Sequence, residues 1–227
     1  MTVGMRRDIG EDRAARARLS GGTSHPSIHA AVRDLLRGER TGRLLDVGCG
    51  RGELRTHVRD LCDDYVGVDA IAYDGFPLEG RLIAADLEQR LPLADAAADA
   101  VVSVETIEHL ENPRAFMREL VRVVRPGGLV IVTTPNQLSA LSLLTLVIRR
   151  RFAAFQDVHY PAHRTALLEV DLRRIASEAG LREVRICYSL AGRMPFSARH
   201  FPRIVARAAP RWFSDTVLVS GRRDRVR

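Results

Sequence analysis

Apolar residues recur along the chain in short runs, separated by stretches in which they return at helical spacing. The run at 100–104 holds a single polar residue, as expected of a central parallel strand that is buried on both faces. The alternation of strands and helices predicts an α/β fold with a parallel, doubly wound sheet that binds ligands at the carboxyl ends of its strands. The predicted strands are residues 43–47, 65–68, 81–85, 100–104, 129–133, 183–188 and 216–220.

Capping residues predict where the helices between these strands begin and end. Leu54, Val58, Leu61 and Cys62 form the apolar face of the helix that follows the first strand. Residues 70–80 hold too many glycines and prolines for a full helix, so a shortened helix at most is predicted there. The other predicted caps and stops are Ser24 and Gly38, Asn112 with Pro113 and Pro126, and Thr165 and Gly180.

A glycine-rich turn joins the first strand to its helix. The strand ends near Asp46, and glycines follow at positions 48, 50 and 52. Because glycine lacks a Cβ atom, such a turn reaches positive φ and lets a ligand lie against backbone amides at a helix N-terminus. An acid before the first glycine repels a pyrophosphate, and the spacing differs from the dinucleotide pattern Gly-x-Gly-x-x-Gly. The turn therefore favours a ligand with an ammonium or sulfonium group and disfavours nicotinamide dinucleotides.

Residues 45–52, a hydrophobic residue followed by Asp-x-Gly-x-Gly-x-Gly, resemble the first motif of the class I S-adenosylmethionine-dependent methyltransferases. The later strands of that family resemble, in the same order, residues 65–69, 84–87, 99–110 and 120–136. The resemblance covers roughly residues 40–190. It implies a Rossmann-like, doubly wound, seven-stranded α/β sheet, mostly parallel with an antiparallel last strand. It also implies an enzyme that uses S-adenosylmethionine.

The same resemblance implies a set of cofactor-binding residues. The turn would hold the amino acid part of the cofactor, the end of the second strand its ribose, and the loop after the third strand its adenine. A strand-end acid or turn glycine without any ligand is the alternative for each position. The implied residues are Asp46, Gly48, Gly50, Asp69, Ala70, Asp86, Leu87 and Val104.

Glu105, Glu108 and His109 follow the fourth strand and are the leading candidates for catalysis. Their spacing of i, i+3 and i+4 puts all three on one face if a helix starts there. This segment resembles the ubiquinone-biosynthesis O-methyltransferases, in which Glu-x-x-Glu-His has been associated with a divalent metal. His109 is accordingly a general base, a ligand of a metal such as magnesium, or a structural residue. His159 and His163 are further candidates for a base or an acceptor contact.

Three appendages depart from the minimal pattern: residues 1–38, an N-terminal arm and helix; 137–163; and 190–214. In 137–163 an apolar helix is followed by three arginines, which predicts a lid over the site, a helix packed on the sheet, or a contact with a membrane surface. The second insertion places prolines and aromatic residues among arginines. His25 and His29, at the start of the first helix, are predicted to be surface side chains, with a position facing the cofactor cleft as the alternative.

The length of 227 residues predicts a single domain, 1–227. The formal net charge is +7, and residues 182–227 hold 11 arginines against 3 acids. That basic region is either a solvated surface or a contact for nucleic acid, anionic lipid or a phosphorylated substrate. Three cysteines without framework spacing, no secretory signal and no membrane-span-length apolar run predict a cytoplasmic protein, with peripheral membrane contact left open.

The expected function is transfer of a methyl group to a hydroxyl of a small molecule, with a sugar, a glycolipid, a quinone precursor or a secondary metabolite as the acceptor. The main enzyme alternative is a nucleic-acid methyltransferase that uses the basic C-terminal region. Ser-Val-Glu-Thr at 103–106 lacks the Asn/Asp-Pro-Pro-aromatic motif of amino-directed members, and a separate recognition domain is not apparent, so nucleic acid is disfavoured. A non-catalytic scaffold with a cofactor fold is the remaining alternative.

Overall fold

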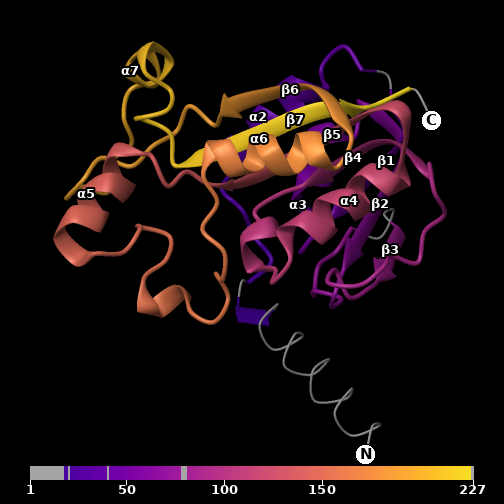
Figure 1. Cartoon of the computed structure of the whole chain (residues 1–227), viewed down its shortest axis with the longest axis horizontal. Coiled ribbons are helices and arrows are strands. Elements are labelled where there is room, and N and C mark those ends of the chain that lie inside the picture. The colour runs from indigo at the N-terminus through magenta and orange to yellow at the C-terminus, as the bar shows by residue number, and fades with distance from the viewer. Residues whose placement is uncertain (1–17, 20, 40, 78–80, 226–227) are drawn as a thin grey trace, which may run out of the picture.

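In the computed structural model, which describes residues 18–19, 21–39, 41–77 and 81–225, a seven-stranded sheet runs through the molecule with helices on both faces (Figure 1). The strand order is β3-β2-β1-β4-β5-β7-β6, and β7 is antiparallel to both of its neighbours while the other pairs are parallel. The predicted fold class is confirmed. The strands are β1 (Thr41–Val47), β2 (Cys62–Asp69), β3 (Arg81–Ala84), β4 (Ala98–Ser103), β5 (Val124–Pro135), β6 (Leu181–Tyr188) and β7 (Thr216–Arg223).

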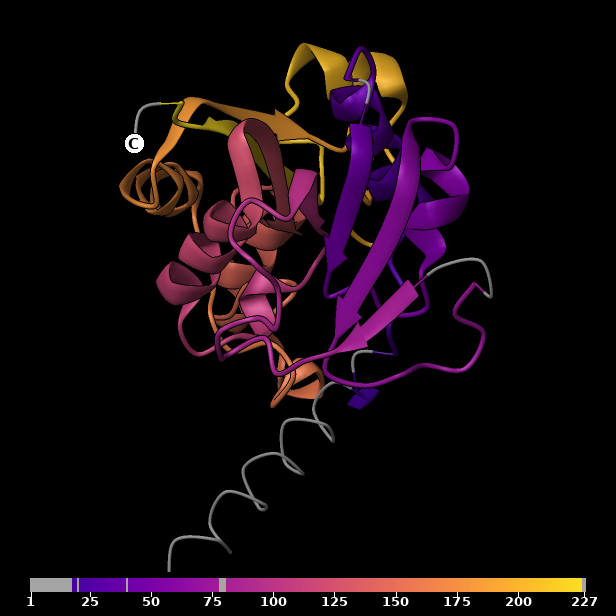
Figure 2. The ribbon, with the colours of Figure 1, turned by 90° about the vertical axis from the view of Figure 1, so that its right-hand side faces the viewer.

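The central strands are apolar on both faces because each face is covered by helices. Leu44 and Leu45 are adjacent in β1 and point to opposite sides, into two separate hydrophobic cores. The helices α2 (Pro26–Leu36) and α3 (Glu53–Val58) cover the face of Leu44. On the face of Leu45 lie α4 (Pro113–Val123) and α6 (Glu169–Glu178), and Figure 2 shows the sheet between the two pairs of helices.

The boundaries of the first two helices differ from the predicted ones. His25, and not Ser24, caps α2, because its ring accepts a hydrogen bond from the Ser27 amide at 3.3 Å. The prediction that Leu61 and Cys62 belong to α3 is wrong. Arg33 donates to the His57 carbonyl and pairs with Asp60, both at 2.5 Å. The helix α3 ends between these two contacts. Cys62 instead begins β2.

Two further predictions about local structure are wrong. Thr165 does not cap α6, because its amide donates to the Glu108 carbonyl at 3.0 Å and its hydroxyl to the Leu110 carbonyl at 3.0 Å. The helix begins later, where the Asp171 carboxylate accepts the Leu168 amide. The strand β5 starts directly after α4 rather than at residue 129. No helix occurs in the described part of 70–80, which agrees with the prediction that this segment is too broken for a full helix.

The two insertions are fastened to each other at one end of the molecule. They contain α5 (Ala140–Arg149), the 3₁₀ helix η2 (Asp157–His159) and α7 (Arg203–Ala208) (Figure 1). Ala140 at the start of α5 donates its amide to the Trp212 carbonyl at 2.8 Å, and Asn136 bridges the carbonyls of Arg211 and Ser214. Ser142 is the one buried residue of α5, so packing of this helix as part of the core is excluded. In the described part of the chain, every helix is too short or too polar to cross a bilayer.

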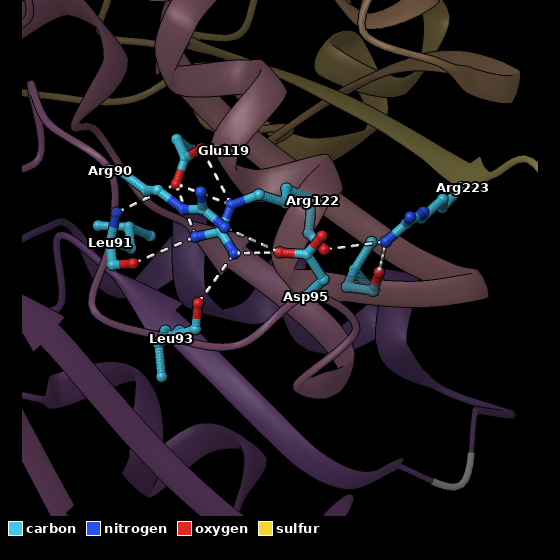
Figure 3. A network of polar contacts seen from close by, with 8 residues as sticks. Arg90, Leu91, Leu93, Asp95, Glu119, Arg122 and Arg223 are labelled. Atoms are coloured by element: carbon cyan, nitrogen blue, oxygen red, sulfur yellow. Dashed lines mark hydrogen bonds and ion pairs between the residues drawn. The ribbon is translucent and has the colours of Figure 1, made fainter.

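An arginine in α4 holds the loop before β4 against the helix (Figure 3). The Arg122 guanidinium is 15% exposed and donates to the carbonyls of Leu91 and Leu93 at 3.1 and 2.8 Å. It also pairs with Glu119 and Asp95 at 2.8 and 2.7 Å. One planar side chain therefore satisfies backbone groups and two acids at the same time.

We expect an Arg122→Gln variant to lower the free energy of unfolding by about 1–3 kcal/mol. The reason is that the two carbonyl oxygens and the two carboxylates lose their donor at a mostly buried position. Chemical denaturation measures the loss. The matched control is Arg114→Gln, which removes an ion pair to Glu178 between half-exposed side chains and should cost under about 1 kcal/mol. Equal losses in the two variants would contradict the structural role of Arg122.

Candidate functional site

A cavity of about 600 Å³ lies at the carboxyl ends of the parallel strands, where a doubly wound sheet binds its ligands. Its walls come from α2, the glycine-rich turn, the loops after β2, β3, β4 and β5, and both insertions. All of the candidate residues line this one cavity, although they are spread over much of the sequence. They are Asp46, Gly48, Gly50, Asp69, Ala70, Asp86, Leu87, Val104, Glu105, Glu108, His109, His159 and His163.

The turn after β1 admits only glycine at two positions. Gly48 has a φ of 80°, and a Cβ atom there would lie 2.1 Å from the Thr106 hydroxyl oxygen. Gly50 has a φ of 51°, and its Cβ would lie 2.3 Å from the Gly22 carbonyl oxygen. The Gly50 amide donates to the Asp69 carboxylate at 2.8 Å, which ties the turn to the end of β2. The turn is thus shaped as a cradle against which a ligand can lie directly.

Asp46 at the end of β1 is a buried acid with one unused oxygen. Its side chain is 2% exposed, Oδ2 accepts a hydrogen bond from the Tyr65 hydroxyl, and Oδ1 has no partner among the described residues. Burial raises the pKa of Asp46 to about 7, although the Tyr65 hydrogen bond opposes this. A cation in the cavity would provide the missing partner, so this site fits the amino acid part of S-adenosylmethionine.

The pH dependence of stability follows from this raised pKa. An aspartate ionises near pH 3.8 when unfolded, whereas Asp46 keeps its proton in the folded protein until about pH 7. The folded state binds more protons in that window, so this group makes the free energy of unfolding fall as pH rises from about 4 to about 7. We expect Asp46→Asn to flatten this part of the stability profile, measured by urea denaturation. An unchanged slope would show that Asp46 ionises normally.

Glu105 and Glu108 follow β4, but they do not share a helix face as predicted. Glu105 adopts a left-handed φ of 47° before the 3₁₀ helix η1 (Ile107–His109) begins. Thr133 donates to the Glu105 carboxylate at 3.1 Å, and Thr134 donates to that of Glu108 at 3.0 Å. Glu108 is fully buried, and its Oε1 has no partner among the described residues. Burial raises the pKa of both carboxyls, and the proximity of Glu108 raises that of Glu105 further.

His109 is held in one tautomer by the first insertion. Its Nδ1 lies 2.9 Å from the Ala162 carbonyl oxygen, which can only accept, so Nδ1 carries the proton. Burial lowers the pKa of His109, which leaves a neutral ring with a lone pair on Nε2. His163 packs edge-on against His109 with ring centroids 4.8 Å apart, and His159 stacks on His163 at 5.4 Å. The first insertion thus brings His159 and His163 into one cluster with His109.

A metal ligand set can be assembled from part of this cluster. A carboxylate oxygen of Glu108 and ring nitrogens of His109 and His163 lie within 4.8 Å of one another, and Glu105 is outside this group. Magnesium prefers oxygen ligands and retains several waters, whereas two of these three donors are imidazoles. This set of ligands therefore does not fit magnesium, and magnesium has no part in the reaction proposed below.

The cavity wall also holds polar residues outside the predicted set, among them Gln137, which sequence reasoning missed, and His29, for which the cleft had been the less favoured alternative. Gln137 is 2% exposed, donates its amide to the Pro135 carbonyl at 3.0 Å and leaves Oε1 without a partner in the described structure. His29 is buried rather than on the surface, and burial lowers its pKa to about 4. The signal for Gln137 was present, because a polar residue directly after a buried strand lies at the edge of the sheet where ligands bind.

Comparison with known proteins agrees with this geometry. A family model described as a methyltransferase domain matches residues 23–186. A relative from Mycolicibacterium smegmatis, named "Probable S-adenosylmethionine-dependent methyltransferase", is 28% identical over 82% of this chain and 71% of its own length. A ubiquinone biosynthesis O-methyltransferase of Maricaulis maris is 34% identical over 46% of the chain, which spans only 45% of that enzyme.

The solved structures show the same architecture. A crystal structure described as a SAM-dependent methyltransferase from Archaeoglobus fulgidus superposes with a TM-score of 0.62 over 86% of this chain and 94% of its own, at 19% identity. That likeness concerns the fold alone. The match of the family model to most of the chain, with the glycine cradle and the unpaired Asp46 oxygen, establishes the family and the cofactor. The chain belongs to the class I S-adenosylmethionine-dependent methyltransferases.

Proposed function

We propose that this chain methylates a hydroxyl group of a small-molecule, sugar or glycolipid acceptor. The observation that carries the proposal is the neutral His109, a residue of the cavity wall whose Nδ1 proton is fixed on the Ala162 carbonyl, so that the lone pair is on Nε2. A hydroxyl nucleophile needs such a base, because its own proton must leave as the new bond forms. One relative of this chain is named as a ubiquinone biosynthesis O-methyltransferase, an enzyme that methylates oxygen, and this likeness supports the choice of a hydroxyl.

The unpartnered oxygens of the cavity support a hydroxylated acceptor. Glu108 Oε1 and Gln137 Oε1 are buried oxygens without hydrogen-bond partners among the described residues, and leaving them unpaired costs free energy. Acceptor hydroxyls would satisfy both atoms and orient the molecule for attack. S-adenosylmethionine supplies an electrophilic methyl group, so the remaining tasks of the chain are to align the acceptor, exclude water and remove one proton.

The roles proposed for the cofactor residues follow the strand ends. Asp46 with the turn glycines would receive the amino acid part, since the unpaired Oδ1 suits an ammonium group. The Asp69 carboxylate, fixed by the Gly50 amide, would accept from the ribose hydroxyls. In the same proposal Asp86 and Leu87 border the adenine, and Ala70 and Val104 complete the wall.

A second candidate, methylation of RNA, rests on the exposed arginines of residues 190–214. A chain that binds the cofactor without transferring its methyl group is a third. A single assay distinguishes these two candidates from methylation of a hydroxylated small molecule or lipid.

The assay incubates the protein with S-adenosylmethionine carrying a labelled methyl group and separate pools of hydroxylated sugars, glycolipids, quinone precursors and RNA. We expect label in a hydroxylated small molecule or lipid, with release of S-adenosylhomocysteine, and a product whose ether resists mild alkali. Label in RNA alone would support the second candidate. Turnover that chelation by EDTA abolishes would overturn the role of His109 as a base that acts without a metal, and cofactor binding without any label would favour the third candidate.

A further inference from the structure

Exposed hydrophobic side chains are concentrated in the two insertions. Among the described residues, nine large hydrophobic side chains are exposed, and seven of these belong to residues 137–163 or 190–214. The exposed fraction reaches 81% at Val147, 79% at Ile204 and 92% at Phe196. The helices α5 and α7 of these insertions lie at the same end of the molecule (Figure 1), and exposed apolar side chains gathered in one region are typical of interaction sites. We call this region the insertion face; its apolar members are Val147, Ile148, Val158, Tyr160, Phe196, Ile204 and Trp212.

The same two insertions carry the whole net charge of the chain. They hold 8 arginines against 1 acid, a net of +7, which equals the +7 of the full sequence, so the remaining residues sum to zero. Three of the arginines have acidic partners, in the pairs Arg151 with Asp157, Arg193 with Asp215 and Arg211 with Glu169. The others are exposed and form no ion pair with any described residue: Arg149, Arg150, Arg199, Arg203 and Arg207.

The insertion face lies beside the acceptor side of the cavity. Ser139, Ala154 and His163 of the first insertion and Ala191 and Arg193 of the second line the cavity wall. The hydrogen bond from Ala140 to Trp212 joins the two insertions, and α5 and α7 occupy the same end of the molecule in Figure 1. A partner bound there would therefore lie next to the part of the cavity wall that the two insertions form.

We propose that the insertion face docks on an anionic phospholipid surface. Aliphatic and aromatic side chains interspersed with unpaired arginines are the combination that inserts shallowly among headgroups while pairing with lipid phosphates. RNA would use the arginines and leave Val147, Ile148 and Ile204 without contacts. A second copy of the chain would bring its five unpaired arginines against the same five arginines of the first copy, which is repulsive. The inference holds whichever acceptor is methylated, because docking needs neither cofactor nor turnover.

The experiment measures sedimentation of the full chain with vesicles of phosphatidylcholine alone and of phosphatidylcholine mixed with phosphatidylglycerol. We expect the protein to pellet with the anionic vesicles, to remain in solution with the neutral ones, and to be released by raised salt. Trp212 is the single tryptophan of the chain and is 52% exposed on this face, so its emission should shift to the blue on docking.

Variants separate the charge from the apolar contribution. Arg203→Gln with Arg207→Gln should weaken partitioning by about thirtyfold, and Ile204→Ser should weaken it without removing the salt dependence. The matched control is Arg118→Gln with Arg174→Gln, which removes the same charge from exposed positions on α4 and α6 and should leave partitioning unchanged. All of these positions are exposed, and cofactor binding by each variant verifies its fold.

Several outcomes would overturn the proposal. Equal pelleting with neutral and anionic vesicles would remove the role of the arginines, and equal weakening by the control pair would make the effect one of net charge alone. Self-association that Ile204→Ser abolishes, without vesicle binding, would assign the face to a second copy. Binding to RNA but not to vesicles would assign it to nucleic acid.

Discussion

A His109→Gln variant will bind S-adenosylmethionine almost as tightly as the wild type and will turn over roughly 100 to 10,000 times more slowly. The reason is that the ring, neutral and fixed through Nδ1 on the Ala162 carbonyl, is positioned to take the acceptor proton and has no assigned contact with the cofactor. Single-turnover methyl transfer and cofactor titration, made on the same preparation, measure the two quantities separately.

The pH profile of the same pair of proteins adds a second test. Burial lowers the pKa of His109 from 6.5, so the ring is an unprotonated base at neutral pH. Wild-type turnover should fall only as pH drops through this lowered value, since the imidazolium has no lone pair to accept a proton. The variant should lack that acidic limb. His57→Gln, outside the cavity wall, is the control, and equal losses of cofactor affinity and turnover in His109→Gln would refute the role of a base.

A Gly48→Ala variant will lose much of its cofactor affinity. The added methyl group would lie 2.1 Å from the Thr106 hydroxyl oxygen, and the residue would have to keep a φ of 80°. Left-handed backbone costs roughly 1–2 kcal/mol for an L-residue, and relief of the contact must move either the turn or Thr106. We expect the dissociation constant to rise by about thirtyfold or more, measured by calorimetry.

Two further variants assign the cause of that loss. Gly180→Ala has a similar positive φ of 99° with nothing within 4 Å of the new methyl group, so it should reduce stability slightly and leave affinity intact. Thr106→Gly added to Gly48→Ala removes the contact and should restore part of the affinity. Unchanged cofactor binding in Gly48→Ala would show that the ligand does not lie on this turn.

The cofactor half of the site was accessible from the sequence because its signals are local. Asp46 and the glycines after it lie within one strand–turn–helix unit, and Asp69 ends the next strand, so the alternation of strands and helices puts them at one sheet edge. Their roles toward the cofactor are what the family resemblance implies. Tyr65, which donates to Asp46, was missed because the contact crosses between strands. In the β1–β2 register Tyr65 lies opposite Leu44, two residues before Asp46, so the strand pairing brings its hydroxyl to the Asp46 carboxylate.

The acceptor half depends on long-range packing and was only partly predictable. His159 and His163 were candidates by residue type, yet their approach to His109 depends on how 137–163 folds back over β4. His29 was predicted to lie on the surface because the periodicity of its own helix does not show which residues of other helices pack against it. The ring centroid of His57 lies 5.1 Å from that of His29. The same limit applies to helix ends, where Arg33 from a different helix terminates α3.

The most direct test of the account is titration calorimetry of S-adenosylmethionine and S-adenosylhomocysteine into the wild type and the Asp69→Ala variant. We predict saturable one-to-one binding to the wild type, weakened in the variant by about 1–3 kcal/mol, because the carboxylate that the Gly50 amide holds would no longer be available to the ribose. Equal affinity in the two proteins, or no binding of either ligand to the wild type, would contradict the cofactor site described here.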